Sequence, residues 1–117
     1  MIEIKDLIKN TLQPLNVPVK FQVYSGKEKT YITFFEYIGQ SEAYADDEET
    51  ETGHYIQVDI WSNDDYTAIV QQTKLLLKQA GFRRTYETEL TENNNGTQIF
   101  HKVLRVFYCE NNDIEEE

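Results

Sequence analysis

The spacing of apolar positions predicts two helices. In residues 3–12, apolar side chains recur every three or four positions, as on one face of a short amphipathic helix, and Pro14 limits its extension. A longer apolar stripe runs through residues 66–80 and ends at Gly81, a residue type common at helix C-termini. Ser62 and Asp65 resemble a capping box with Asp in place of Glu, which predicts that this second helix begins there.

Five other segments alternate in polarity or are rich in β-branched and aromatic residues, as strands are. These segments are residues 19–24, 30–38, 54–61, 82–91 and 98–109. Within the third segment, the side chains expected to face the core are His54, Ile56, Val58 and Ile60. The last segment is apolar on both faces, which indicates a central strand or a face that meets another chain. The Asn-Gly pair at 95–96 predicts a hairpin that joins the last two strands.

The order α-β-β-β-α-β-β predicts an α+β fold, a mainly antiparallel sheet packed against two helices. With 117 residues in all, residues 1–109 are expected to form a single domain. The acidic residues 110–117 are expected to form a mobile tail. Residues 39–53 are polar and acidic and lie between two glycines, so we expect a long loop there.

The charge is concentrated in two short segments. The chain has 11 Lys and Arg against 21 Asp and Glu, a net charge of −10. Residues 42–65 hold nine acids and no Lys or Arg, and residues 110–117 hold five acids. Because phosphate binding depends on Lys and Arg, this balance argues against a nucleic-acid binder and against anionic membranes. No apolar run reaches 18 residues and no export signal is visible, so a cytosolic, reducing location is expected.

The sequence offers no recognisable catalytic set. His54 and His101 lie in predicted strands, and Cys109 is eight strand residues, or about 26 Å, from His101. The single cysteine also excludes an internal disulfide. The acidic run at 46–51 lacks the ligand spacing and the glycine of an EF-hand calcium loop. We therefore expect no enzymatic activity, no cofactor and no metal.

Several residues are instead candidates for an interaction surface. Six rings crowd the middle strands, where neighbours face opposite sides, so some of them must point away from the core. They are Tyr31, Phe34, Phe35, Tyr37, Tyr44 and Tyr55. Arg83 and Arg84 either protect a sheet edge or bind an acidic segment of a neighbouring copy. Trp61 is expected to anchor the core or an interface. The full set of expected interface residues is Tyr44, Asp46, Asp47, Glu48, Glu49, Glu51, Trp61, Arg83 and Arg84.

Short segments along the chain resemble one family of phage proteins. The matching segments are YITFFE (31–36), YADDE (44–48), YIQVDIWS (55–62), AGFR (80–83) and IFHK (99–102). They are similar to the tail completion, or tail-to-head joining, proteins of long-tailed phages and prophages of Gram-positive hosts. The resemblance covers about residues 19–109, in order, and consists of strand and turn patterns.

The resemblance implies a non-enzymatic virion protein that caps the tail tube as a ring, expected to be hexameric. The ring would bind the tail tube protein and the head-completion (stopper) protein of the neck, and DNA would pass through it without specific binding. The protein would then lie in the virion neck, and in the host cytoplasm during assembly. Two alternatives stay open at this point. One is an acidic DNA mimic that inhibits a basic partner, and the other is a small enzyme whose site forms between subunits.

Overall fold

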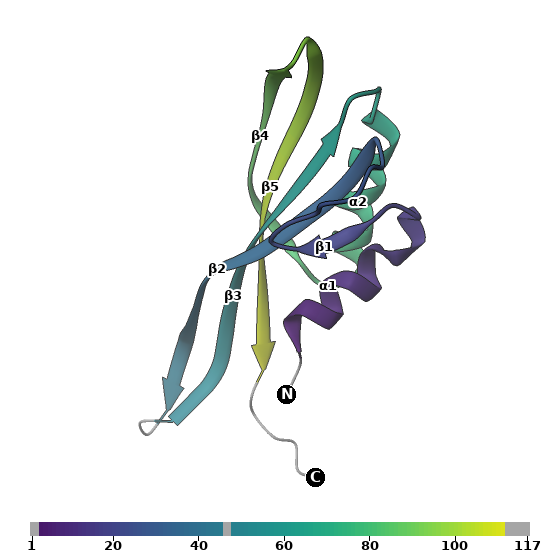
Figure 1. Ribbon diagram of the computed structural model, residues 1–117. Helices are drawn as coiled ribbons and strands as arrows, with labels where there is room; N and C mark the ends of the chain where they lie inside the picture. The colour runs from purple at the N-terminus through teal and green to yellow at the C-terminus, as the bar shows by residue number, and fades with distance from the viewer. Residues whose placement is uncertain (1–2, 46–47, 112–117) are drawn as a thin grey trace.

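Five strands form one sheet in the spatial order β1-β2-β3-β5-β4 (Figure 1). The elements of this computed structural model are α1 (Ile4–Leu12), the short 3₁₀ helix η1 (Gln13–Leu15), β1 (Val19–Phe21), β2 (Thr30–Ala45), β3 (Glu48–Ser62), α2 (Thr67–Gln79), β4 (Arg83–Asn94) and β5 (Thr97–Asn111). The structure describes residues 3–45 and 48–111, and for residues 38–45, 48–52, 94 and 111 it describes the backbone alone.

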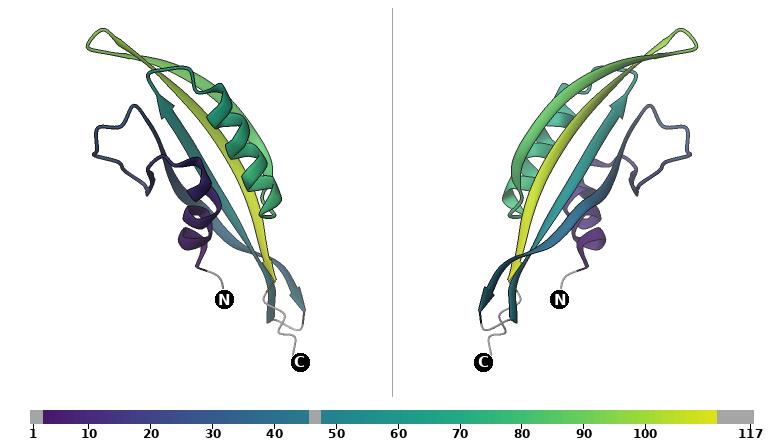
Figure 2. Two further views of the ribbon diagram at one scale, coloured as in Figure 1. Left: turned by 90° about the vertical axis from the view of Figure 1, so that its right-hand side faces the viewer. Right: turned by 90° about the vertical axis from the view of Figure 1, so that its left-hand side faces the viewer.

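The predicted fold class is confirmed. β1 runs parallel to β2, and every other neighbouring pair of strands is antiparallel. Both helices lie on the same face of the sheet, α1 beside β1 and α2 alongside β4 (Figure 2). This arrangement leaves an α+β layer structure with one covered face and one uncovered face.

The core lies between this helical layer and the sheet. The predicted inward positions of β3 are confirmed, because Ile56, Val58 and Ile60 are at most 1% exposed. The helices contribute the buried residues Ile4, Ile8 and Leu12 from α1 and Val70, Thr73 and Leu77 from α2. β5 contributes Leu104 and Val106 to the same core. Side chains between these core positions therefore point to the uncovered face, since neighbours along a strand alternate.

The prediction of a loop at residues 39–53 is wrong, because β2 and β3 continue through this segment as a long hairpin. Pairing runs out to Ala45 opposite Glu48, with register shifts near Glu36 and between Ser41 and Tyr44. An acidic composition lowers β propensity, and that signal misled the sequence prediction. The ladder prevails because it satisfies backbone donors and acceptors that a loop would leave to water.

Two element boundaries also differ from the prediction, the end of β1 and the start of α2. β1 stops at Phe21 because Gln22 adopts a left-handed φ of 71°, and Val23 is 76% exposed. The second helix begins at Thr67, so Ser62 and Asp65 do not form the predicted capping box. Instead, Asp65 accepts hydrogen bonds from the backbone and the hydroxyl of Thr67.

The predicted hairpin turn at Asn95-Gly96 and the predicted helix end at Gly81 are both confirmed. Asn95 and Gly96 form a two-residue turn with positive φ angles of 53° and 81°, and Asn94 pairs with Thr97 across it. Gly81 follows α2 with a φ of 101°, a backbone conformation that residues other than glycine rarely adopt.

β5 includes Glu110 and Asn111, although the sequence predicts an acidic tail from residue 110. Glu110 is only 7% exposed, and its carboxylate lies 3.0 Å from Nε2 of His54 on β3. Residues 112–117 lie outside the described residues. The two long hairpins extend in opposite directions, so the molecule measures 58 × 23 × 23 Å (Figure 1).

Candidate functional site

The candidate functional site is the face of the sheet opposite the helices. No helix within residues 3–45 and 48–111 packs on this face (Figure 2). It is formed by side chains that alternate with the core positions of four strands. We call it the uncovered face, and its central members are Tyr31, Thr33, Phe35, Tyr55, Gln57, Asp59, Trp61, His101, Val103, Arg105 and Phe107.

One end of the uncovered face is a row of stacked rings. Tyr31, Trp61 and His101 are paired across β2, β3 and β5, so their side chains lie side by side. The indole of Trp61 stacks on the imidazole of His101 with 3.7 Å between ring centroids, and Tyr31 stacks on the other side of Trp61 at 6.1 Å. Tyr24 continues the row, with its ring 4.5 Å from that of Tyr31. The row offers ring edges to solvent, since the ring faces are occupied by one another.

A hydrogen-bonded polar group lies at the centre of the face. Nε2 of His101 lies 2.7 Å from Oδ1 of Asp59, which also accepts from the side-chain amide of Gln57 at 3.0 Å. Nε1 of Trp61 donates to the hydroxyl of Thr33 at 3.1 Å. Asp59 and His101 are 4% and 8% exposed, although no helix covers them, because neighbouring rings shelter them. Buried polar groups of this kind hold the surrounding side chains in fixed positions.

Burial and nearby carboxylates raise the pKa values of Tyr31 and Tyr66, which lie near the Trp61 end of the sheet. Partial burial raises the pKa of Tyr31, and the carboxylate of Glu92 raises it further. On the helical side, burial and the hydrogen bond to Glu89 raise the pKa of Tyr66 strongly. Both phenols therefore stay neutral at physiological pH, and that of Tyr66 donates to Oε2 of Glu89 at 2.9 Å.

The other end of the face combines aromatic rings with two arginines. The rings of Tyr37 and Tyr55 lie 6.0 Å apart, and those of Tyr55 and Phe107 lie 4.9 Å apart. The guanidinium of Arg105 lies 5.3 Å from the centroid of Tyr37, and that of Arg83 lies 5.2 Å from the centroid of Phe107. Aromatic residues and arginine are the types enriched at protein interfaces, which makes this face suited to binding another protein.

The structure brings two of the expected interface residues to this face. Trp61 and Arg83 both point to it, although they occupy opposite ends. Arg84 points to the helical side, where its Nε lies 3.3 Å from a carboxylate oxygen of Glu87. The two arginines of the doublet therefore serve different faces.

The expected acidic interface residues lie along the β2–β3 hairpin. Tyr44 belongs to β2, and Glu48, Glu49 and Glu51 belong to β3, beyond the part of the sheet that the helices cover (Figure 1). Asp46 and Asp47 lie outside the described residues. The backbone of the other four residues therefore lies at one end of the long axis (Figure 1).

Four residues of the site were missed by the sequence analysis: Gln57, Asp59, His101 and Arg105. The available signal was a polar or charged residue inside an otherwise apolar strand. Asp59 lies between Val58 and Ile60, and Arg105 lies between Leu104 and Val106. Such a residue must point away from the core or form a hydrogen bond with another side chain. Asp59 and Arg105 do both.

The thiol and the histidines do not form a catalytic group. Strand pairing places Cys109 opposite Gly53, next to His54 along β3, but the side chains of His54 and Cys109 point to opposite faces. His54 is held on the helical side, with its ring nitrogens 2.6 Å from Glu36 and 3.0 Å from Glu110. Within the described part of the chain, no three His, Cys, Asp or Glu side chains are grouped to hold a metal ion.

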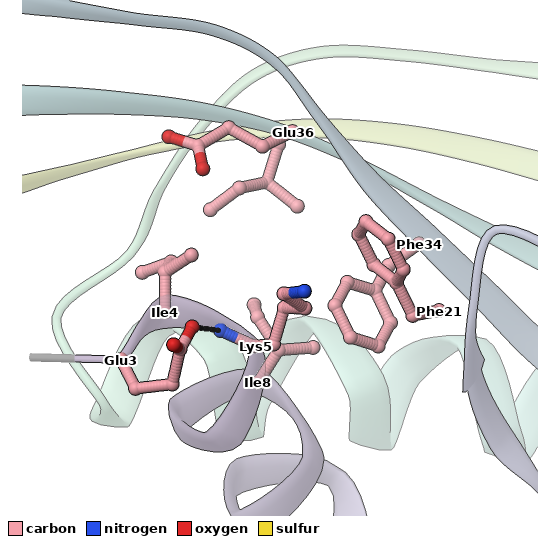
Figure 3. Close-up of a pocket in the computed structure, with 8 residues that line it drawn as sticks. Glu3, Ile4, Lys5, Ile8, Phe21, Phe34 and Glu36 are labelled. Atoms are coloured by element: carbon pink, nitrogen blue, oxygen red, sulfur yellow. Dashed lines mark hydrogen bonds between the residues drawn. The ribbon is translucent and has the colours of Figure 1, made fainter.

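A pocket of about 250 Å³ lies between α1 and the sheet (Figure 3). Its floor is apolar, and its charged groups already have partners: Glu3 accepts from the Lys5 backbone, Lys5 lies over the ring of Phe21, and Glu36 contacts His54. Ligand pockets are usually larger and present polar groups that are available to a ligand. This pocket is therefore a weaker candidate site than the uncovered face.

Comparison with known proteins gives no independent assignment. No protein-family model and no curated protein matches the chain. Among the residues that the structure describes, no helix is both long enough and apolar enough to cross a bilayer.

Proposed function

We propose that this protein is a structural component of a long-tailed phage or prophage, which completes the tail and joins it to the head. In this role, copies assemble into a ring, expected to be hexameric, on the end of the tail tube. The ring binds the head-completion protein, and DNA passes through its channel. The protein performs no catalysis and needs no cofactor or metal.

The observation that carries this proposal is the uncovered aromatic face of the sheet. Half-buried rings line it, and Tyr86 and Leu90 on the adjoining β4 are 49% and 47% exposed. Covering such a surface stabilises an assembly by about 25 cal/mol per Å² of apolar area removed from water. Because both helices lie on the other face, a second protein chain is the simplest cover. Contacts between different patches of identical subunits close by rotation into rings.

The charge and the resemblance of residues 19–109 to tail completion proteins support the same proposal. A ring around DNA must let phosphates slide, and a net charge of −10 repels them, whereas a basic channel would hold them. A DNA mimic also explains the acidity. The excess charge, however, lies in two short segments instead of along a helix-like surface.

Electron microscopy tests the proposal directly. Concentrated purified protein should form rings with a central channel, and antibody fragments against it should label the head–tail junction of phage particles. Phage lacking the gene should yield separate heads and tails, and added protein should join them. Normal particles without the gene, or tight salt-sensitive binding of a basic host protein by a monomer, would contradict the proposal.

A further inference from the structure

Two arginines on the uncovered face have aromatic neighbours but, among the side chains that the structure describes, no acidic ones. We define the arginine–aromatic patch as Tyr37, Arg83, Tyr86, Arg105 and Phe107. The Arg105 guanidinium lies 5.3 Å from the ring centroid of Tyr37 and 5.2 Å from that of Tyr86. Arg83 lies 5.2 Å from the centroid of Phe107, and both arginines are solvent-exposed. Nε of Arg105 donates to Oε1 of Gln57 at 3.1 Å, and the other N–H groups of the two exposed guanidinium groups can bind a carboxylate.

The absence of an acidic partner is unusual in so acidic a chain. Among the side chains that the structure describes, neither Arg83 nor Arg105 forms an ion pair. By contrast, Lys74, Arg84 and Lys102 all contact the carboxylate of Glu87 on the helical side. Asp59, the carboxylate of the neighbouring row, is already bonded to His101 and Gln57. Within the described side chains, the patch therefore presents two positive charges that have no carboxylate partner.

The acidic part of β3 supplies matching charge. Glu48, Glu49 and Glu51 lie within the 42–65 segment, which has no Lys or Arg. In the same molecule, β3 runs without a break from Glu48 to Ser62, and Glu51 is about 13 Å along the strand from Tyr55 beside the patch. Because a continuous paired strand does not fold back on its own sheet, the acidic end of this hairpin can meet the patch of another molecule.

We infer that the acidic end of the β2–β3 hairpin of one copy binds the arginine–aromatic patch of the next copy. This inference rests on the proposed function in one respect, that the partner is a sibling subunit of the ring. The contact joins two different surfaces, so it is head-to-tail and suits a closed ring. Arginine–carboxylate pairs supply direction, because bidentate hydrogen bonds require one orientation. The rings around the guanidinium groups exclude water from the contact.

Complementary charge reversal tests this contact. One variant carries Arg83→Glu and Arg105→Glu, and a second carries Glu48→Lys, Glu49→Lys and Glu51→Lys. Each has like charges on its hairpin and its patch, so sedimentation at 50 mM salt should show self-association at least tenfold weaker than in the wild type. A mixture of the two variants should associate again, and so should one chain that carries all five changes.

Controls separate charge at the patch from charge in general. Lys9→Glu with Lys78→Glu changes the net charge as much as the patch variant does, but at exposed positions of the helical layer, and should associate like the wild type. The fluorescence of Trp61, the only tryptophan, reports whether each variant is folded. Raising the salt to 1 M shortens the screening length to about 3 Å and should weaken wild-type association.

Three results would overturn the inference. They are unchanged association of the patch variant, failure of the mixture to associate, and a wild type that stays monomeric at millimolar concentration in low salt. The proposed function is read separately, by labelling the junction of phage particles. Rings or labelled junctions that survive charge reversal would reject this contact and leave the proposed function standing.

Discussion

At the level of single residues, the uncovered face depends on a few buried polar contacts. Asp59 accepts hydrogen bonds from both Gln57 and His101, and His101 in turn stacks against Trp61. Nδ1 of His101 is buried, and among the described side chains it has no hydrogen-bond partner; a carboxylate oxygen of Glu92 lies 3.8 Å away. These contacts fix the ring edges that a partner would meet, and a fixed surface loses less entropy on binding than a mobile one.

Removing the shared acceptor should destabilise the fold. We expect Asp59→Ala to lower the free energy of unfolding by about 2–3 kcal/mol, because the buried His101 and the half-buried Gln57 lose their shared acceptor. Urea titration followed by Trp61 fluorescence measures this loss. Asp6→Ala, at an exposed position of α1, should change the stability by no more than about 0.5 kcal/mol. Equal stability of the two variants would show that the Asp59 contacts contribute little.

At the level of elements, one carboxylate links α2 to the sheet. Glu87 on β4 lies 2.8 Å from Nζ of Lys74 on α2 and 2.9 Å from Nζ of Lys102 on β5. The hydrogen bonds from Lys74 and then Lys102 lower the pKa of Glu87 from 4.5 to about 2. A carboxyl with a lowered pKa in the folded state stabilises the fold above its unfolded pKa. That contribution disappears as the pH falls from about 4.5 towards 2.

The stability of a Glu87→Gln variant should therefore depend less on pH. We expect a loss of about 1 kcal/mol at pH 7, the scale of partly exposed ion pairs, and a difference from the wild type that vanishes near pH 2. Thermal unfolding followed by circular dichroism between pH 2 and 7 measures both quantities. Glu28→Gln, in the exposed turn before β2, is the matched control and should follow the wild-type profile. A constant difference across this pH range would contradict the link.

At the scale of the whole molecule, the two long hairpins give the protein an extended shape with separate ends. The body of the sheet carries the helices, and the β2–β3 hairpin extends beyond it (Figure 1). The core residues that the structure describes come from the helices and from the part of the sheet that the helices cover. The hairpin end is thus available for assembly at little cost to folding.

Shortening this hairpin should separate assembly from folding. Replacing residues 42–51 by Asn-Gly keeps Ser41 paired with Thr52 and closes the ladder with a two-residue turn. We expect the free energy of unfolding of this variant to lie within about 1 kcal/mol of the wild-type value. We also expect it to form no rings and to join no heads to tails. The matched control replaces residues 94–97 by Asn-Gly at the opposite end, and should still assemble. Rings formed by the first variant would show that the hairpin is dispensable.

Periodicity by itself determined the elements and the core. The order α-β-β-β-α-β-β, the inward side of β3 and the turns at Asn95-Gly96 and Gly81 follow from short-range rules that tertiary contacts did not override. The two-sided apolar pattern of the last strand also indicated a second buried face, and β5 is indeed an interior strand of the sheet.

Tertiary structure alone decided the site. Asp59, His101 and Arg105 come together with Trp61 and Tyr37 only through strand order and register, which depend on pairing between distant segments. The same pairing converted the acidic 39–53 segment from an expected loop into strands, because backbone hydrogen bonds outweighed weak local propensity. Sheet pairing also places Arg83 and Arg84 on opposite faces. Alternation along a strand shows that two neighbours face opposite sides, but only the sheet decides which side the helices cover.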